Sequence, residues 1–496
     1  MTKKDEGTLE HLKAEKSGVH SHTVTSGGGI HSKFPIDAAF LGKPAHLRTR
    51  NDRYELGRAL REHCPRAEHA EFKVARKGRP DPVQLIMASN QGRLEKLLPI
   101  RYGRMIVSPF AHFRGAATIM ASDLSVQPAT GYALQACGDC HLLNFGAFAT
   151  PERRIVFDIN DFDETFPAPW EWDLKRLAAS FVIASRHNGF RAADCVAPAF
   201  ELAQSYRNKM REYAEMPALE AWYSFLDYQQ LIEMGEDERL KKRRRRMLEK
   251  AMARTHQDEF IRIAHVEDGK PRIKDEPPLV YHETDQKSAD LYERVEHTMI
   301  EYRKSLSPER RVLIDRYEFV DAAMKVVGVG SVGTYCAIAL FFAAENDPLF
   351  LQVKEARTSV LEPYVDHPPF ASQGERVVFG QKLMQAASDM FLGHAVGKLG
   401  RHIYIRQLRD VKIKPMIEIF APENMVGFAQ ACGWALARAH ARSGDAAVIA
   451  GYIGKNAVFA RAIAQFATRY ADQNELDHAA LIEAVRDLRL DVYSDI

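Results

Sequence analysis

The sequence predicts an α+β fold in which one strand-rich segment interrupts a largely helical chain of 496 residues. Three observations predict it. Helical periodicity of apolar residues dominates much of residues 36–320. Residues 321–415 are instead rich in β-branched and aromatic residues, broken by glycines and turns. Helical periodicity returns over residues 416–496. We therefore expect a helical lobe that is divided around a small strand-rich lobe.

The composition is that of a globular protein, with 46% hydrophobic and 27% charged residues. Lys and Arg number 68 and Asp and Glu 66, so the net charge of +2 provides no field that would attract nucleic acid or an anionic membrane. The sequence has neither an apolar stretch long enough to cross a bilayer nor the apolar core of a signal peptide. We expect a cytoplasmic protein without nucleic-acid or membrane partners.

Within the helical parts, several segments have individual signatures. Residues 1–35 are polar and predict a disordered tail. A single helix is expected over Met105–Leu124, and another over Leu174–Phe190 that ends at Asn188-Gly189. The basic run Lys241–Arg246 follows acidic residues, which favours a solvated helix face over a docking surface.

The densest chemistry lies in residues 131–175, which include CGDCHLLNFGAFATPERRIVFDINDFDETF from Cys137. The spelling of Cys137, Cys140 and His141 is that of a c-type haem attachment motif, but the chain shows no export signal and no second Cys or His pair. Phosphoryl transfer from ATP explains more of the block. It needs one Asp to orient the attacking hydroxyl, and an Asn and a second Asp to hold Mg²⁺.

The pattern GDxHxxN, an apolar strand into DFD, and then WDL resembles the catalytic segment of aminoglycoside phosphotransferases and choline kinases, within the protein-kinase-like superfamily. The resemblance implies Asp139 as the catalytic Asp, and Asn144 and Asp161 as Mg²⁺ ligands. Asp158 and Asp163 remain alternatives for the last role. Cys137 departs from the His or similar residue that usually precedes Gly-Asp in those enzymes, so the support of the loop differs here.

More closely, residues from about Arg101 to Ala447 resemble the bacterial family called domain of unknown function 2252. The resemblance is carried by GDCHLLNFG, FDINDFDE, WEWDLKRLAAS, VGVGSVGT, LFLQVKEA and CGWALARAHARSGD. That family has no settled activity, so the resemblance indicates a family more firmly than a reaction.

The segment VGVGSVGT contains an intact GxGxxG. In a dinucleotide-binding unit the glycines open a helix, whereas in a kinase lobe they join two strands and a strand lysine follows. Here Lys354 lies on an apolar run after a turn at Asn346-Asp347-Pro348, which favours the kinase arrangement. The expected nucleotide-binding residues of this segment are Gly328, Gly330, Ser331, Gly333 and Lys354.

A phosphate-binding lysine needs a carboxylate to hold it. We expect Glu375, at the start of a helix GERVVFGQKLMQAASDMFLG, with Glu355 and Glu362 as weaker candidates. The strand HIYIRQLRD would lead into a hinge where backbone groups from Gln407 to Arg409 meet adenine.

The order of these motifs is reversed, because in kinases the glycine loop precedes the catalytic loop. The helix CGWALARAHARSGD resembles the one that leads into the catalytic loop of aminoglycoside-kinase-like enzymes, yet here it follows the glycine-loop lobe. A circular permutation explains this order, and two halves completing each other across a dimer are the alternative.

The predicted function is ATP- and Mg²⁺-dependent phosphoryl transfer to a hydroxyl of a small molecule or protein. Two alternatives stay open: a nucleotide-binding regulatory protein without turnover, and transfer of the nucleotidyl group from ATP.

Overall fold

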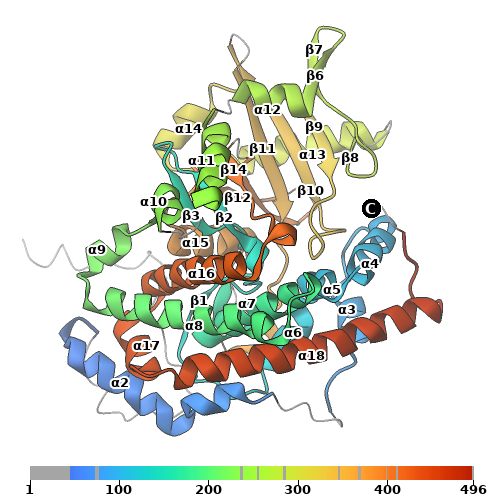
Figure 1. Cartoon of the computed structure of the whole chain (residues 1–496). Helices are drawn as coiled ribbons and strands as arrows, with labels where there is room; N and C mark the ends of the chain where they lie inside the picture. The colour runs from blue at the N-terminus through green and yellow to red at the C-terminus, as the bar shows by residue number, and fades with distance from the viewer. Residues whose placement is uncertain are drawn as a thin grey trace, which may run out of the picture.

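The computed structural model describes residues 45–493 except 73–77, 235–237, 254–255, 283–285, 345–346, 367–369, 398 and 409–410. Within them the predicted α+β class is confirmed, with an antiparallel sheet above a stack of helices in Figure 1. The predicted tail, residues 1–35, lies outside the described residues.

The larger sheet has six antiparallel strands in the order β12-β13-β11-β10-β9-β8. Its strands are β8 (Val280–Tyr281), β9 (Glu318–Lys325), β10 (Cys336–Ala343), β11 (Asp347–Glu355), β12 (Gly393–Val396) and β13 (His402–Gln407). Side chains alternate between its faces, so Ala322 and Met324 enter one apolar cluster while Ala323 enters another. The predicted strand, glycine loop and two following strands are confirmed, as is the strand from His402. Asp347 and Pro348 of the expected turn already belong to β11, and Asn346 lies outside the described residues.

Helices and a hairpin flank this sheet. On one side lie α13 (Gln286–Ser305) and α14 (Pro308–Ile314), and on the other α12 (His256–Ile263) with the hairpin of β6 (Ala264–Glu267) and β7 (Lys270–Ile273). Helix α15 (Gln373–Met384) contacts both β12 and the helical stack. It ends at Met384, about two turns earlier than the sequence pattern predicted.

The helical stack is built around α7 (Trp170–His187), which is buried along almost its whole length. Around it pack α8 (Ala192–Glu215), α16 (Pro422–Ser443), α17 (Ala446–Ile453) and α18 (Val458–Arg486), with α2 (Arg50–His63) against α17. The indole of Trp170 stacks on Tyr206 at 5.7 Å between ring centroids. As predicted, the helix stops at Asn188-Gly189: α7 ends at His187, Asn188 is its C-cap, and Gly189 follows with a φ of 75°.

The predicted single helix over Met105–Leu124 is wrong. The chain forms α4 (Leu98–Ile106), α5 (Pro109–Gly115) and α6 (Ala117–Leu124). Pro109 starts a new helix because Ser108 caps it, its Oγ accepting the N–H of Ala111 at 3.1 Å. With α3 (Pro82–Ala88), these helices lie beside the C-terminal α18, the blue and red ribbons of Figure 1.

Short strands complete the region between the lobes. A four-stranded sheet has the order β14 (Lys412–Ile413), β2 (Phe145–Ala149), β3 (Ile155–Ile159) and β5 (Leu226–Asp227), and β1 (Ala133–Ala136) pairs with β4 (Phe166–Pro169). Helix α10 (Tyr228–Glu233) packs on β3 and β5, α11 (Glu238–Met252) packs on β14, and α9 (Ala218–Tyr223) packs on α16.

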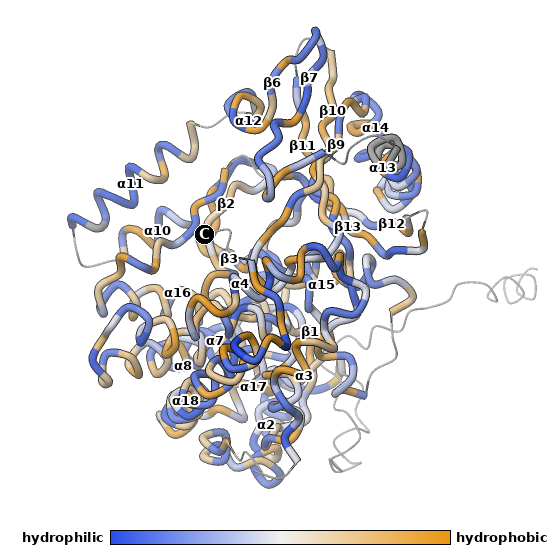
Figure 2. Tube along the Cα trace, turned by 90° about the vertical axis from the view of Figure 1, so that its right-hand side faces the viewer, coloured by the Kyte–Doolittle hydropathy of each residue, from blue (hydrophilic) through white to orange (hydrophobic). Residues whose placement is uncertain are grey.

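Hydropathy follows this arrangement. Helix α11, which carries the basic run, is largely hydrophilic in Figure 2. Two of its cations are paired, Lys241 with Glu238 at 2.7 Å and Arg245 with Glu233 at 2.6 Å. Over the described part of the chain, no helix combines the length and the apolar character needed to span a bilayer.

Candidate functional site

The loop after β1 is fixed by a carboxylate of α7. Asp173 accepts the backbone N–H groups of Cys137 at 2.6 Å and of Gly138 at 2.9 Å, and its Oδ2 lies 3.2 Å from Nε2 of His440. Gly138 has a φ of 87°, and a Cβ there would lie 2.2 Å from the carbonyl oxygen of Glu164. Only glycine fits this position, which holds the next residue, Asp139, in a defined place.

Asp139 is partly exposed and is held on one side by Arg176 of α7. The Arg176 Nη2 lies 2.5 Å from Asp139 Oδ1, while Oδ2 lies 3.8 Å from Nε2 of the buried His141. Asp173 and Arg176 are three residues apart on the same helix, so one face of α7 supports both the loop backbone and its carboxylate.

Asn144 closes the same loop. Its Nδ2 donates to the backbone carbonyl of Asp139 at 2.7 Å, and its own carbonyl accepts the N–H of Asn160 at 2.7 Å. The hairpin β2–β3 thus begins at Asn144 and returns beside it just before Asp161. The predicted juxtaposition of Asp139, Asn144 and Asp161 is present in the geometry.

The two alternatives to Asp161 are placed very differently. Asp158 is 1% exposed and bonds Nη2 of the equally buried Arg438 at 3.0 Å and the N–H of Ala386 at 2.7 Å. Its carboxylate is committed to a buried ion pair, so it is a poor candidate for a metal ligand. Asp163 lies with Asp161 at the same site.

Lys354 of β11 reaches this acidic loop from the sheet. Its buried Nζ lies 2.6 Å from Asp163 Oδ2 and 3.9 Å from Asp161 Oδ1. The hydroxyl of Tyr404, on the neighbouring β13, donates to the other oxygen of Asp163. Residues almost two hundred positions apart therefore share one charged cluster.

The charged groups of this cluster shift one another's pKa values. Burial would lower the pKa of Lys354, but Asp161 and Asp163 hold it well above its usual value. Burial alone would raise the pKa of Asp163, yet Lys354 lowers it. Burial and the adjacent Asp163 raise the pKa of Asp161, and Lys354, at 3.9 Å, offsets this only in part. A further cation bound beside Asp161 would lower its pKa.

The glycine segment forms a strand–loop–strand between β9 and β10, with no helix at Gly333. Gly328 and Gly333 have φ values of 66° and 85°, which favour glycine. The loop reaches the acidic cluster, because Oγ of Ser331 lies 3.4 Å from Asp163 Oδ2. Gly330 lies over the end of α5, where an added Cβ would be 3.1 Å from the carbonyl oxygen of Arg114.

The predicted carboxylate partner of Lys354 is wrong. Glu375 lies in the first turn of α15 and acts electrostatically on His394 rather than on Lys354. Of the weaker candidates, Glu355 pairs with Arg401 at 3.0 Å and Glu362 accepts from Gln373 at 3.2 Å.

The expected hinge is only partly described. Gln407 ends β13, and its backbone N–H donates to the carboxylate of Asp389. Leu408 donates its N–H to the carbonyl of Phe350 at 2.9 Å. These two donors are therefore engaged within the protein, and Arg409 lies outside the described residues.

No group of three or more His, Cys, Asp or Glu side chains that could hold a metal occurs among the described residues. Cys137 and Cys140 are both buried, and burial and their mutual contact raise the pKa of Cys137, which argues against thiolate ligation. Magnesium needs fewer protein ligands, since it is usually bound through one or two carboxylates, waters and substrate phosphates. Asn144 and Asp161 could supply the protein ligands.

Several contributing residues were not assigned roles from sequence. Asp173, Arg176 and His440 support the loop that carries Asp139, and Tyr404 holds Asp163. The available signal is that Asp173 directly precedes the predicted helix Leu174–Phe190 and Arg176 lies in its first turn. Tyr404 and His440 carry no comparable local signal.

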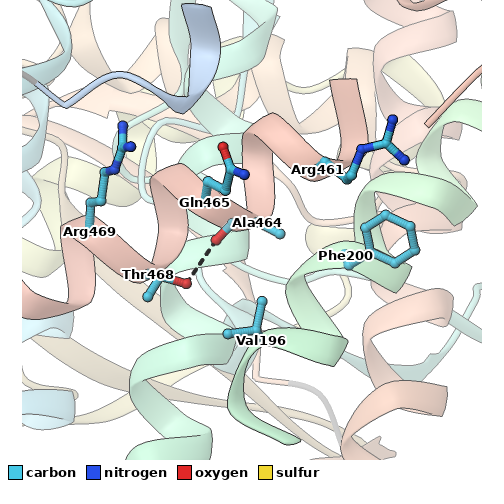
Figure 3. Close-up of a pocket in the computed structure, with 7 residues that line it drawn as sticks. All are labelled: Val196, Phe200, Arg461, Ala464, Gln465, Thr468 and Arg469. Carbon is cyan, nitrogen blue, oxygen red and sulfur yellow. Dashed lines mark hydrogen bonds between the residues drawn. The ribbon is translucent and has the colours of Figure 1, made fainter. Parts of the chain in front are cut away.

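Two of the cavities outside this cluster border helix α8. One of about 410 Å³ lies between α8 and α18 (Figure 3), and its only charged lining residues are Arg461 and Arg469. The other, of about 1080 Å³, lies between α8, α11 and α16 and reaches Gly146, two residues beyond Asn144. Arg243 and Arg244 of the basic run line it.

Comparison with known proteins finds one family. The family model DUF2252, described as an uncharacterized protein conserved in bacteria, matches residues 93–484. Searches of the curated proteins and of the solved structures each found no match.

Proposed function

We propose that this chain, which belongs to the DUF2252 family, binds ATP with Mg²⁺ between its strand-rich and helical lobes and transfers the terminal phosphoryl group to a hydroxyl. The observation that carries the proposal is the charged cluster of Lys354, Asp161 and Asp163 beneath the glycine loop. Asp139 and Asn144 adjoin it through the β2–β3 hairpin.

The arrangement supports a protein-kinase-like fold in permuted order. The glycine loop joins antiparallel β9 and β10, and the lysine lies on the next strand, β11, paired with β10. The helix α16 supplies His440, which lies within bonding distance of the Asp173 that holds the loop backbone. One chain thus brings the glycine loop, the lysine and the acidic loop together, as a permuted fold requires.

Each residue then has a role in the reaction. Lys354 would bind phosphate oxygens, and Asn144 and Asp161 would hold Mg²⁺, which neutralises phosphate charge. Oδ2 of Asp139 would take the proton of the acceptor hydroxyl as its oxygen bonds to the γ-phosphorus. The bond from that phosphorus to the β–γ bridging oxygen breaks, and ADP leaves.

A regulatory nucleotide-binding protein is the second candidate. The observation that favours it is the ion pair of Asp139 Oδ1 with Arg176, because a carboxylate that only shapes the loop would make the same contact. Transfer of the nucleotidyl group is the third.

The three candidates are separated with ATP labelled at either the α or the γ phosphate, incubated with the full chain, Mg²⁺ and cell-extract acceptors. Transfer of γ label to an acceptor supports the proposal. Transfer of α label supports nucleotidyl transfer. Binding of ATP without transfer of either label supports the regulatory candidate, and absence of ATP binding contradicts all three.

A further inference from the structure

Helix α5, in the N-terminal helical layer, lies next to the site although it belongs neither to residues 131–175 nor to the glycine segment. Its last residues lie against Arg176 and against the glycine loop. The carbonyl of Phe113 accepts Nη2 of Arg176 at 3.0 Å, and Arg176 holds Asp139. The carbonyl of Arg114 lies under Gly330 of the glycine loop. Arg114 therefore lies where the helical layer meets both the loop that carries Asp139 and the glycine loop.

Arg114 differs from the other cations at the site in its hydrogen bonding. Lys354 is paired with Asp163 and Arg176 with Asp139. Arg406 donates to Gln352 and to the carbonyl of Asn160, both at 3.1 Å. Arg114 makes no hydrogen bond or ion pair with any residue that the structure describes, and its Nε is buried.

The guanidinium carbon lies 5.9 Å from the centre of the Phe110 ring, but a buried guanidinium nitrogen without a hydrogen bond is costly unless an anion joins it. Burial lowers the pKa of Arg114, while the charges of Asp139 and, to a smaller extent, Glu418 oppose that shift. These carboxylates act on Arg114 through their charge, and its buried Nε has no hydrogen-bond acceptor among the described residues. A guanidinium matches the oxygens of a phosphate group with two parallel donors.

We infer that Arg114 contacts the terminal phosphate of bound ATP, on the side of the catalytic Asp139. The inference rests on the proposed function and assigns to the N-terminal helical layer a direct part in it. Lys354 approaches from the sheet on the Asp163 side, whereas Arg114 approaches from α5 beside Asp139. A cation next to Asp139 faces the phosphoryl group to be transferred, where charge is greatest during transfer.

The test compares Mg²⁺ complexes of a non-hydrolysable ATP analogue and of ADP, titrated calorimetrically into the full chain. Arg114→Gln should weaken binding of the ATP analogue about tenfold or more and change ADP affinity less than about twofold. Arg114→Lys keeps the charge without the planar fork and should lose less. Arg461→Gln, an exposed arginine beside the α8–α18 pocket (Figure 3), is the matched control and should change neither affinity.

Equal losses for ATP and ADP, or no loss for either, would overturn the assignment of Arg114 while leaving the proposed function intact. If the parent protein binds neither nucleotide, the proposed function fails and the assignment fails with it. Should Arg114→Gln not fold, as judged by thermal unfolding, Arg114→Lys decides: an unchanged ratio of ATP to ADP affinity contradicts the inference.

Discussion

The ammonium group of Lys354 and the carboxylate of Asp163 lie 2.6 Å apart, although 191 positions separate them in the chain. This ion pair joins the sheet to the acidic loop and is reinforced by Tyr404. In the proposed function, a triphosphate would share Lys354 with Asp163, and the ion pair would hold the lysine in position for it.

The first prediction concerns Lys354. Lys354→Ala should weaken binding of Mg²⁺·ATP at least about tenfold, because it removes a phosphate-binding cation and leaves two carboxylates facing the phosphates. Calorimetric titration measures the affinity. Lys304→Ala, on the exposed face of α13, is the control and should bind as the parent does. Equal affinities for Lys354→Ala and the parent would contradict the assignment of the glycine-loop lobe.

The second prediction separates Asp158 from Asp161. Asp158→Asn should lower the free energy of unfolding by about 3–5 kcal/mol, because it leaves the buried Arg438 without a counter-charge. Urea denaturation measures this loss. Asp315→Asn, which breaks the exposed pair with Arg303, should have no measurable effect. A metal-binding role for Asp158 would instead predict a parent-like stability and a loss of Mg²⁺-dependent nucleotide binding.

The third prediction is a pH dependence. Burial raises the pKa of Glu164 from 4.5 to about 7, so the folded protein binds this proton more tightly than the unfolded chain does. Ionisation of Glu164 therefore destabilises the fold progressively between pH 4.5 and about 7. Glu164→Gln cannot ionise and can still accept the N–H of Val360.

The measured quantity is the difference in unfolding free energy between Glu164→Gln and the parent at several pH values. We expect the variant to gain about 2 kcal/mol relative to the parent from pH 5 to pH 8, a figure reduced for the partial exposure of the side chain. A difference that stays constant with pH would show that Glu164 ionises normally in the folded protein.

The parts of the site that could be predicted are those set by local geometry. Asp139, Asn144 and Asp161 lie together because a short loop and a two-stranded hairpin bring them together, whatever surrounds them. The glycine loop between two strands followed from the turn signals and the β-branched residues around it.

The partner of Lys354 could not be predicted in this way, because it depends on how α15 is placed against the acidic loop. In the structure Arg376, the neighbour of Glu375, faces that loop and donates to the carbonyl of Asp163 at 2.9 Å. A shift of one residue turns a helix by about 100°, which periodicity alone does not resolve when both neighbours are charged. The break at Pro109, by contrast, had a local signal in Ser108-Pro109 that the apolar periodicity masked.

The last prediction separates an enzyme from a binding protein. Asp139→Asn keeps the shape of the side chain, and its amide oxygen can still accept a hydrogen bond from Arg176. The variant cannot take a proton from an acceptor hydroxyl, so phosphoryl transfer should fall by about two orders of magnitude or more while Mg²⁺·ATP binding stays nearly unchanged. Asp161→Asn should instead weaken Mg²⁺-dependent nucleotide binding itself, because it removes a metal ligand. Both variants are compared with the parent in a γ-label transfer assay beside a nucleotide-binding assay. If Asp139 only shapes the loop, Asn substitutes for it without loss, and parent-like transfer by Asp139→Asn would remove the catalytic assignment and leave nucleotide binding as the function of the site.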